Sequence, residues 1–191
     1  MANVAYMMED YTAVADASEK ALMIDDKCVE ALFFYAKACI GHGDTTNAVA
    51  MLTKAIGLKP DYTEAYLLRG ETLLSAGETA EADEDACHLV KEYPENEDIL
   101  MLKARIERAK GNPSEAISYY GKAIDTNPFN ANAYRERGKL RIDNGDESGG
   151  QADYRQAKEL EEQQNAGNEK QDIENEIKDK YKSIDPYGVF S

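Results

Sequence analysis

Hydrophobic and polar positions recur along this chain with a fixed period. The period is marked by prolines that stop a predicted helix and are followed within two residues by an acidic or amide side chain: Pro60, Pro94 and Pro128, which stand at equal intervals. If the second residue after each proline is taken as the last of a repeat, the central chain divides into 29–62, 63–96, 97–130 and 131–164. Each of these repeats is 34 residues long. A fixed period of this length indicates a stack of repeats rather than a conventional domain.

Each repeat has a predicted turn near its centre. The fifteenth place is always glycine and the sixteenth is always polar; the glycines are Gly43, Gly77, Gly111 and Gly145. Glycine adopts a positive φ after a helix without steric cost, and the polar residue that follows can cap the next helix. Every repeat is therefore predicted to be a pair of antiparallel helices.

Small and large side chains occupy fixed places in the repeats. The eighth and twentieth places hold only alanine or glycine: Ala36, Gly70, Ala104 and Gly138, then Ala48, Ala82, Ala116 and Gly150. The fourth place holds larger residues: Leu32, Tyr66, Leu100 and Tyr134. Helices can approach closely where small residues face large ones, so this alternation predicts an all-α fold of packed helix pairs.

The repeat length and the small residues at the eighth and twentieth places resemble the tetratricopeptide repeat (TPR) family, as do the alanine at the twenty-seventh place and the proline at the thirty-second, each of which three of the four repeats have. The resemblance covers residues 29–164 and implies a right-handed α-solenoid of antiparallel helix pairs. The chain departs from the family at the fourth place, which never holds tryptophan. It also departs at the seventh, where leucine is usual but the chain has Tyr35, Arg69, Lys103 and Arg137.

Residues 1–28 continue the register backwards and predict a partial repeat that opens at about the seventh place. Glu9 and Asp10 then stand where the central turn is expected. Because an uncapped array exposes the apolar face of its last helix, we expect natural sequence to precede Met1, which would mark an expression start or an internal boundary.

After the last repeat, the sequence predicts a capping helix over residues 165–184 and an apolar tail over 185–191. The helix has a capping-box-like start at 168–171. Its apolar stripe consists of Ile173, Ile177, Tyr181 and Ile184.

Composition excludes several classes of partner. The chain has 37 acidic and 22 basic residues, a formal net charge of −15 and no Lys/Arg-rich run, so we expect no nucleic acid partner. No apolar run approaches the roughly 18 residues of a membrane span, so membrane insertion is not expected.

The three cysteines, Cys28, Cys39 and Cys87, cannot all pair and are interpreted as reduced thiols, which favours a cytoplasmic setting. A removed signal peptide stays open if the N-terminus is truncated.

No residue pattern indicates catalysis, a metal site or a cofactor. His42 is interpreted as a turn residue and Cys39 as a core residue. Cys87 and His88 are adjacent on a predicted helix, where successive side chains point about 100° apart and make a poor pair of ligands. The segment 143–147 lacks the spacing of a calcium loop and is explained by the repeat turn. We therefore expect no enzyme.

In the TPR family the first helix of each repeat lines a concave groove, in which the second, fifth, sixth, ninth and twelfth places face a ligand. The resemblance implies a peptide-binding surface made of Phe33, Phe34, Lys37, Leu67, Leu68, Glu71, Met101, Leu102, Arg105, Arg108, Arg135 and Lys139. Its apolar residues occupy the first three full repeats, and a basic end lies beyond them, made of Arg105, Arg108, Arg135 and Lys139. The alternative for the fifth and sixth places is that they belong to the core between helices.

The implied function is a non-enzymatic protein-interaction scaffold that binds a peptide or a helix of an unidentified protein. Binding of Hsp70 or Hsp90 C-termini is not expected, because the places of the family's carboxylate clamp hold Phe33, Lys37, Leu68, Asp98 and Leu102. The alternative function is a structural or self-associating module that stacks through its open N-terminal end. A third alternative is an enzyme or metal protein that uses cysteine and histidine.

An acidic run on the second helix of repeat 63–96 is predicted to be a solvated face. It consists of Glu78, Glu81, Asp83, Glu84 and Asp85. The alternative is a second contact surface for a basic partner.

Overall fold

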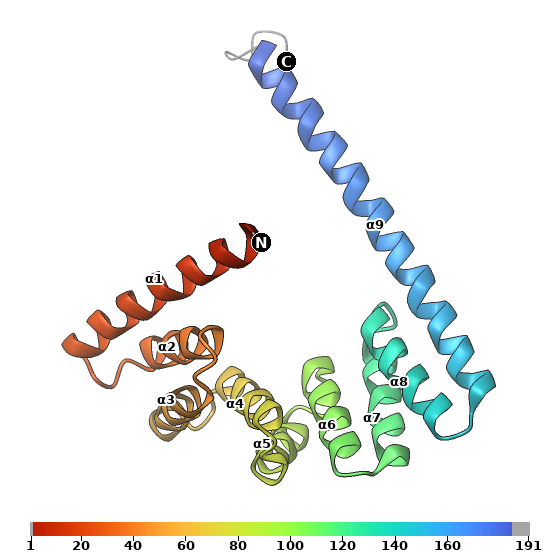
Figure 1. Ribbon diagram of the computed structural model, residues 1–191, viewed down its shortest axis with the longest axis horizontal. Coiled ribbons are helices and arrows are strands. Elements are labelled where there is room, and N and C mark those ends of the chain that lie inside the picture. The colour runs from red at the N-terminus through yellow and green to blue at the C-terminus, as the bar shows by residue number, and fades with distance from the viewer. Residues whose placement is uncertain (1, 185–191) are drawn as a thin grey trace. The chain divides into compact units, whose positions relative to one another are not determined.

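The structure is a computed structural model that describes the backbone of residues 2–184 and the side chains of residues 11–167. Within these ranges every regular element is an α-helix, as predicted (Figure 1). The helices are α1 (Ala2–Ile24), α2 (Val29–Gly41), α3 (Thr45–Leu58), α4 (Thr63–Ala76), α5 (Thr79–Glu92), α6 (Glu97–Ala109), α7 (Pro113–Thr126), α8 (Ala131–Asp143) and α9 (Glu147–Ile184). The chain divides into two compact bodies, an N-terminal body of residues 1–126 and a C-terminal body of residues 127–191.

The first helices of the four repeats start at the predicted interval. α2, α4, α6 and α8 begin at Val29, Thr63, Glu97 and Ala131, which are the first residues of the four predicted repeats. Each is followed after a short turn by the second helix of its repeat. The period read from the sequence is therefore the period of the helix pairs.

The glycine turns are confirmed. The described residues with positive φ are all glycines, and they are the four at the fifteenth place: Gly43, Gly77, Gly111 and Gly145, with φ between 78° and 88°. At the first of these turns the Asp44 carboxylate accepts a hydrogen bond of 3.1 Å from the Asn47 backbone N–H and caps α3. Glycine ends one helix and the next polar residue can start the following one.

The N-terminal body is built by packing between successive helices. From α1 to α7 each helix contacts the next one in the chain, and α4 also contacts α6. The small residues at the eighth and twentieth places of the repeats allow neighbouring helices to pack closely. A Cβ added to Gly70, for example, would lie only 2.9 Å from the Leu102 side chain. Ala48, Ala82 and Ala116 are fully buried. Such nearest-neighbour packing is typical of solenoid folds.

The C-terminal body consists of α8 packed on α9. Its core contains Ala131, Ala157 and Leu160, with the half-buried Tyr134 packed against them. Gly138 on α8 approaches the backbone of α9 so closely that an added Cβ would lie 3.0 Å from the Gly150 carbonyl oxygen.

The predicted turn at Glu9 and Asp10 is wrong. α1 runs without a break through these residues, from Ala2 to Ile24. The position of the turn glycine is held by Glu9 in this segment. Since no residue there favours a positive φ, nothing ends the helix.

A separate capping helix over 165–184 is also wrong. α9 is a single helix from Glu147 to Ile184, and it includes both the second helix of the last repeat and the segment predicted as a cap. The first three repeats have proline at the thirty-second place, whereas the last has Glu162. A glutamate continues a helix that proline would stop. The side chains of the predicted stripe and the apolar tail lie outside the described residues.

Among the helices that the structure describes, none combines the length and the apolar character needed to cross a bilayer.

Candidate functional site

The predicted peptide-binding residues lie on the first helices of the repeats, as the period requires. Those of α2, α4 and α6 belong to the N-terminal body, whereas Arg135 and Lys139 belong to α8 in the C-terminal body. The structure therefore brings the residues of repeats 29–62, 63–96 and 97–130 together within one body.

On α2 the predicted residues form an exposed aromatic surface. Phe34 is 49% exposed, and its ring meets the half-buried Phe33 edge to face, with 5.9 Å between ring centroids and an interplanar angle of 72°. Phe33 also packs against Tyr62, whose centroid is 5.2 Å away. The Lys37 ammonium lies 5.8 Å from the Phe33 centroid. α2 buries Leu32 and Ala36 in the core and thereby leaves Phe34 at the surface.

On α4 the two predicted leucines lie at the edge of the core. Leu67 is half-buried against the core cluster that contains Leu73 and Ile106. Leu68 is half-buried against the cluster around Leu52. Both leucines thus support the fold and still expose part of their side chains.

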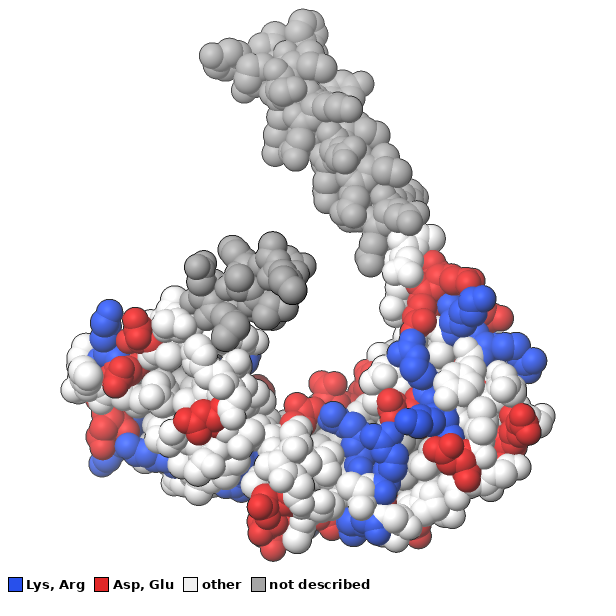
Figure 2. Space-filling model, viewed as in Figure 1, with Lys and Arg blue, Asp and Glu red and all other residues white. Residues whose placement is uncertain are grey.

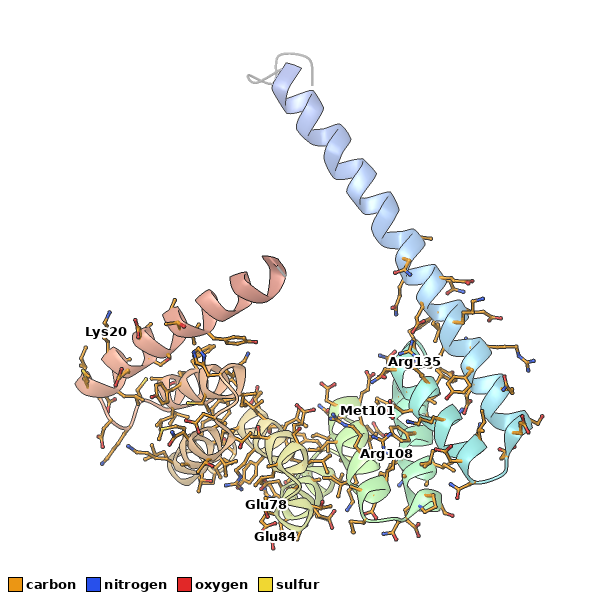
Figure 3. The ribbon with its side chains drawn as sticks, in the orientation of Figure 1. Lys20, Glu78, Glu84, Met101, Arg108 and Arg135 are labelled. Carbon is orange, nitrogen blue, oxygen red and sulfur yellow. The ribbon has the colours of Figure 1, made fainter. Side chains whose placement is uncertain are left out.

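On α6 the apolar residues belong to the core. Met101 is 7% exposed and Leu102 is fully buried, so the core alternative describes both and they are not part of an accessible surface. The reason is that α6 contacts α4, α5 and α7, which leaves little of the helix in contact with solvent. Figure 3 shows Met101 and Arg108 on this helix.

The predicted basic end is partly neutralised by acidic residues. Arg105 on α6 binds Glu71 on α4, with 2.6 Å between Nη2 and Oε1, and both side chains are about a third or more exposed. These two residues occupy the ninth place of successive repeats and are 34 residues apart in the chain. Arg135 forms an ion pair with Glu161 within the C-terminal body. Lys139 and Arg108 are exposed. Acidic and basic side chains are interspersed on the face of α2 to α6 shown in Figure 2.

A buried ionic cluster between α5 and α6 was not predicted from the sequence. Lys103 and Glu107 are 6% and 5% exposed and are joined by a contact of 2.8 Å between Nζ and Oε1. Lys103 also binds Asp83. Lys110 binds Asp83 at 3.0 Å and Glu107 at 3.1 Å, and the Asn112 amide donates to Glu107 at 2.8 Å. Charged residues at helical spacing gave no signal that distinguished this cluster from a solvated face.

The cluster keeps its charges. Burial by itself would raise the pKa of Glu107, but hydrogen bonds from Asn112, Lys103 and Lys110 lower it to about 2. Burial would lower the pKa of Lys103, but hydrogen bonds to Asp83 and Glu107 outweigh this effect and raise it. Both groups are therefore ionised at neutral pH, which suits a structural role better than proton transfer.

The acidic run on α5 is divided between surface and interior. Glu78, Glu81 and Glu84 are exposed; Figure 3 labels Glu78, which is the N-cap residue just before α5, and Glu84 on α5. Asp85 is only 4% exposed, and Asp83 is half-buried and paired with Lys103, so the prediction of a solvated face is wrong for these two residues. The Asp85 carboxylate accepts a hydrogen bond from Arg69, which occupies the seventh place of the repeat on α4.

The cysteine and histidine positions show no joint site. Cys39 is buried in a core cluster, as predicted, and His88 packs beside Tyr66. The exposed Cys87 lies near Lys103, with 3.3 Å between Nζ and Sγ. Over the described side chains, no group of three or more histidine, cysteine or acidic residues is arranged to hold a metal ion.

Known proteins share the repeat and the fold. Family models described as tetratricopeptide repeat match residues 40–106, 88–131 and 101–165. A comparison with curated proteins finds no match.

Solved structures are similar in fold at low identity. A crystal structure of MamA aligns with a TM-score of 0.74 at 23% identity, over 83% of this chain and 92% of MamA. A MamA structure from Desulfovibrio magneticus RS-1 gives 0.70 at 19% identity, over 83% and 97% of the two chains. YrrB, described as a TPR protein with an unusual peptide-binding site, gives 0.66 at 15% identity, over 83% and 82%.

The matched ranges cover most of the four repeats, and the helix pairs inside them have the glycine turns and small packing residues that the repeat requires. This chain belongs to the tetratricopeptide repeat family.

Proposed function

We propose that the chain is a non-enzymatic protein-interaction scaffold that binds an extended peptide or a helix across α2 and α4. Membership of the TPR family supports an interaction scaffold in general. The observation that carries the specific proposal is Phe34, a large aromatic side chain that is 49% exposed at a place where the family binds ligands. Exposed aromatic residues are enriched where proteins bind partners.

The surface offers apolar contacts beside a few charges. The rings of Phe33 and Phe34 and the edges of Leu67 and Leu68 would contact apolar side chains of the ligand. Lys37 lies next to this surface. An acidic residue of the ligand would compete with Glu71 for Arg105. The proposed ligand is therefore an apolar peptide or amphipathic helix with at least one acidic residue. The peptide-binding site in the description of YrrB supports a peptide as the ligand class.

A peptide library displayed on phage would test the proposal. Peptides selected on the unaltered protein are expected to be rich in apolar and acidic residues and to lose about tenfold or more in affinity on Phe34→Glu, because the change removes a large apolar contact and adds repulsion. The matched control is Phe129→Glu, which alters another exposed aromatic residue that lies outside α2 and α4. Equal loss on both changes, or no loss on Phe34→Glu, would refute the proposed surface.

The second candidate function is self-association through the N-terminal end. An apolar cleft of about 380 Å³ lies between α1 and α2 and is lined by Val14, Ala17, Ala21, Ala31 and Phe34, among others. Met23 and Ile24 at the end of α1 are 77% and 90% exposed. Sedimentation velocity at increasing concentration would show dimers that Ala17→Arg abolishes. A monomer at all concentrations would rule this function out.

A further inference from the structure

A cleft of about 250 Å³ lies where the loop before α4 meets the end of α5. Its walls include Pro60, Asp61, Tyr66, His88, Glu92 and Tyr93. This volume is several times the roughly 30 Å³ that one water molecule occupies, so the cleft has room for a small organic group. None of the residues proposed above for peptide binding lines it.

Three of the lining side chains are aromatic. The rings of Tyr66 and His88 lie 4.6 Å apart between centroids, with an angle of 40° between their planes. Tyr93 is 45% exposed, so part of its ring is free to meet a ligand. The Tyr66 ring already attracts one cation, because the Arg69 guanidinium carbon lies 5.5 Å from its centroid.

The charged side chains of the cleft are acidic. Asp61 and Glu92 line it, and no lysine or arginine does. In the part of the chain that the structure describes, no ion pair or side-chain hydrogen bond engages either carboxylate. The repeat that contributes α4 and α5 has nine acidic and two basic residues, which adds to the negative potential around the cleft.

The next repeat provides an internal comparison. A corresponding cleft of about 500 Å³ is lined by Pro94, Glu95, Leu100, Lys122, Asp125 and Thr126. One repeat further along the chain, Pro94 takes the place of Pro60, Leu100 that of Tyr66, and Lys122 that of His88. Both junctions therefore form a cleft, but the two paired rings occur only in the first of these two clefts, and a leucine and a lysine take their places in the second.

We propose that the cleft lined by Tyr66, His88 and Tyr93 binds an organic cation, such as the guanidinium group of an arginine side chain or a methylated ammonium group. The aromatic rings attract a cation through their π-faces, and the two carboxylates stabilise its charge. Weakly hydrated, bulky cations fit best, because they lose little hydration when they enter an aromatic cleft.

Choline and its uncharged isostere 3,3-dimethylbutan-1-ol are suitable probes, because they have the same shape and differ in charge. Titration of the whole chain, followed by NMR of the tyrosine ring protons, is expected to give saturable shifts of the Tyr66 and Tyr93 signals with choline. The affinity of the uncharged alcohol is expected to be lower than that of choline by a factor of about five or more. Equal binding of the two probes, or no saturable shift with choline, would overturn the proposal.

Two variants test the role of the rings. The double change Tyr66→Leu and His88→Lys gives the cleft the side chains of its neighbour and is expected to weaken choline binding about tenfold or more. Leucine occurs at this place in repeats 29–62 and 97–130, so the change suits the packing. Tyr93→Asn, at an exposed position, is expected to weaken binding without loss of helix content. The control is Tyr119→Leu, outside the cleft, which should leave binding unchanged. Binding that persists in both cleft variants would contradict the proposal.

Discussion

Arg69 on α4 forms a two-pronged ion pair with Asp85 on α5, with 2.8 Å from Nε to Oδ2 and 2.6 Å from Nη2 to Oδ1. The side chains are only 17% and 5% exposed. The same pair recurs two repeats later in the C-terminal body, where Arg137 binds Asp153 at 2.9 and 2.7 Å. An arginine at the seventh place, where leucine is usual in the family, is thus accommodated by an aspartate on the partner helix.

Loss of one partner of this pair should be costly. We expect Asp85→Ala to lower the free energy of unfolding by about 3–5 kcal/mol, because it leaves the Arg69 charge buried without a counterion. The double change Arg69→Leu and Asp85→Leu should cost far less, about 1 kcal/mol, or stabilise the protein, since the two leucines need no ionic partner. Urea denaturation followed by circular dichroism measures both. Equal loss in the single and the double variant would contradict the explanation.

The buried cluster around Glu107 should make stability depend on acid. The pKa of Glu107 is about 2 in the folded protein, against 4.5 as its ordinary value, so on acidification the unfolded chain takes up a proton first. The stabilisation is complete above about pH 5 and is lost as the pH falls towards 2, with a total of about 3 kcal/mol. Urea midpoints between pH 2 and 7 should follow this course. Glu107→Gln should flatten the acid limb, and Glu81→Gln, on the exposed face of α5, should not.

The turn glycines should be hard to replace. Gly77 has a φ of 87°, where alanine is strained although the space is open, so Gly77→Ala should cost about 1–2 kcal/mol. Gly57 lies inside α3, also with open space around it, and Gly57→Ala should stabilise the protein by about 0.5–1 kcal/mol. Thermal unfolding of the two variants provides the comparison. A similar effect of the two changes would show that the positive φ is not the cause.

Core and surface residues of the predicted groove should separate in stability measurements. Met101→Ala should cost about 2–5 kcal/mol, because it leaves a cavity under a side chain that is 7% exposed. Phe34→Ala, at 49% exposure, should cost clearly less than Met101→Ala. Denaturation with urea checks the difference. If Phe34→Ala lowered the free energy of unfolding more than Met101→Ala, Phe34 would be a core residue and not part of an accessible surface.

The helix pairs were predictable because they depend on local chemistry. A glycine at the fifteenth place permits a positive φ, and a proline at the thirty-second place stops a helix, wherever the chain folds. Where these residues are missing, at Glu9 and Glu162, the predicted helix ends were wrong and the helices run on. The repeat therefore predicts a helix end only where its glycine or proline is present, and glutamate stands at both of these places.

The surface could be predicted only in part. The period correctly assigned the groove residues to the first helices of the repeats, but it could not separate Phe34 from Met101, since both occupy apolar places on a first helix. Their burial depends on how many helices surround α2 and α6. For the same reason the sequence could not show that Asp85 is buried while Glu84 beside it is exposed.

The sequence by itself determined the repeat length, the helix pairs, the turns and the family, because each follows from residues a few places apart along the chain. Only the tertiary structure decided which charges are paired, which apolar residues remain accessible, and that Tyr66 and His88 form one wall of an acidic cleft. These properties depend on contacts between helices, and neighbouring repeats with the same period can bring different side chains into the same place.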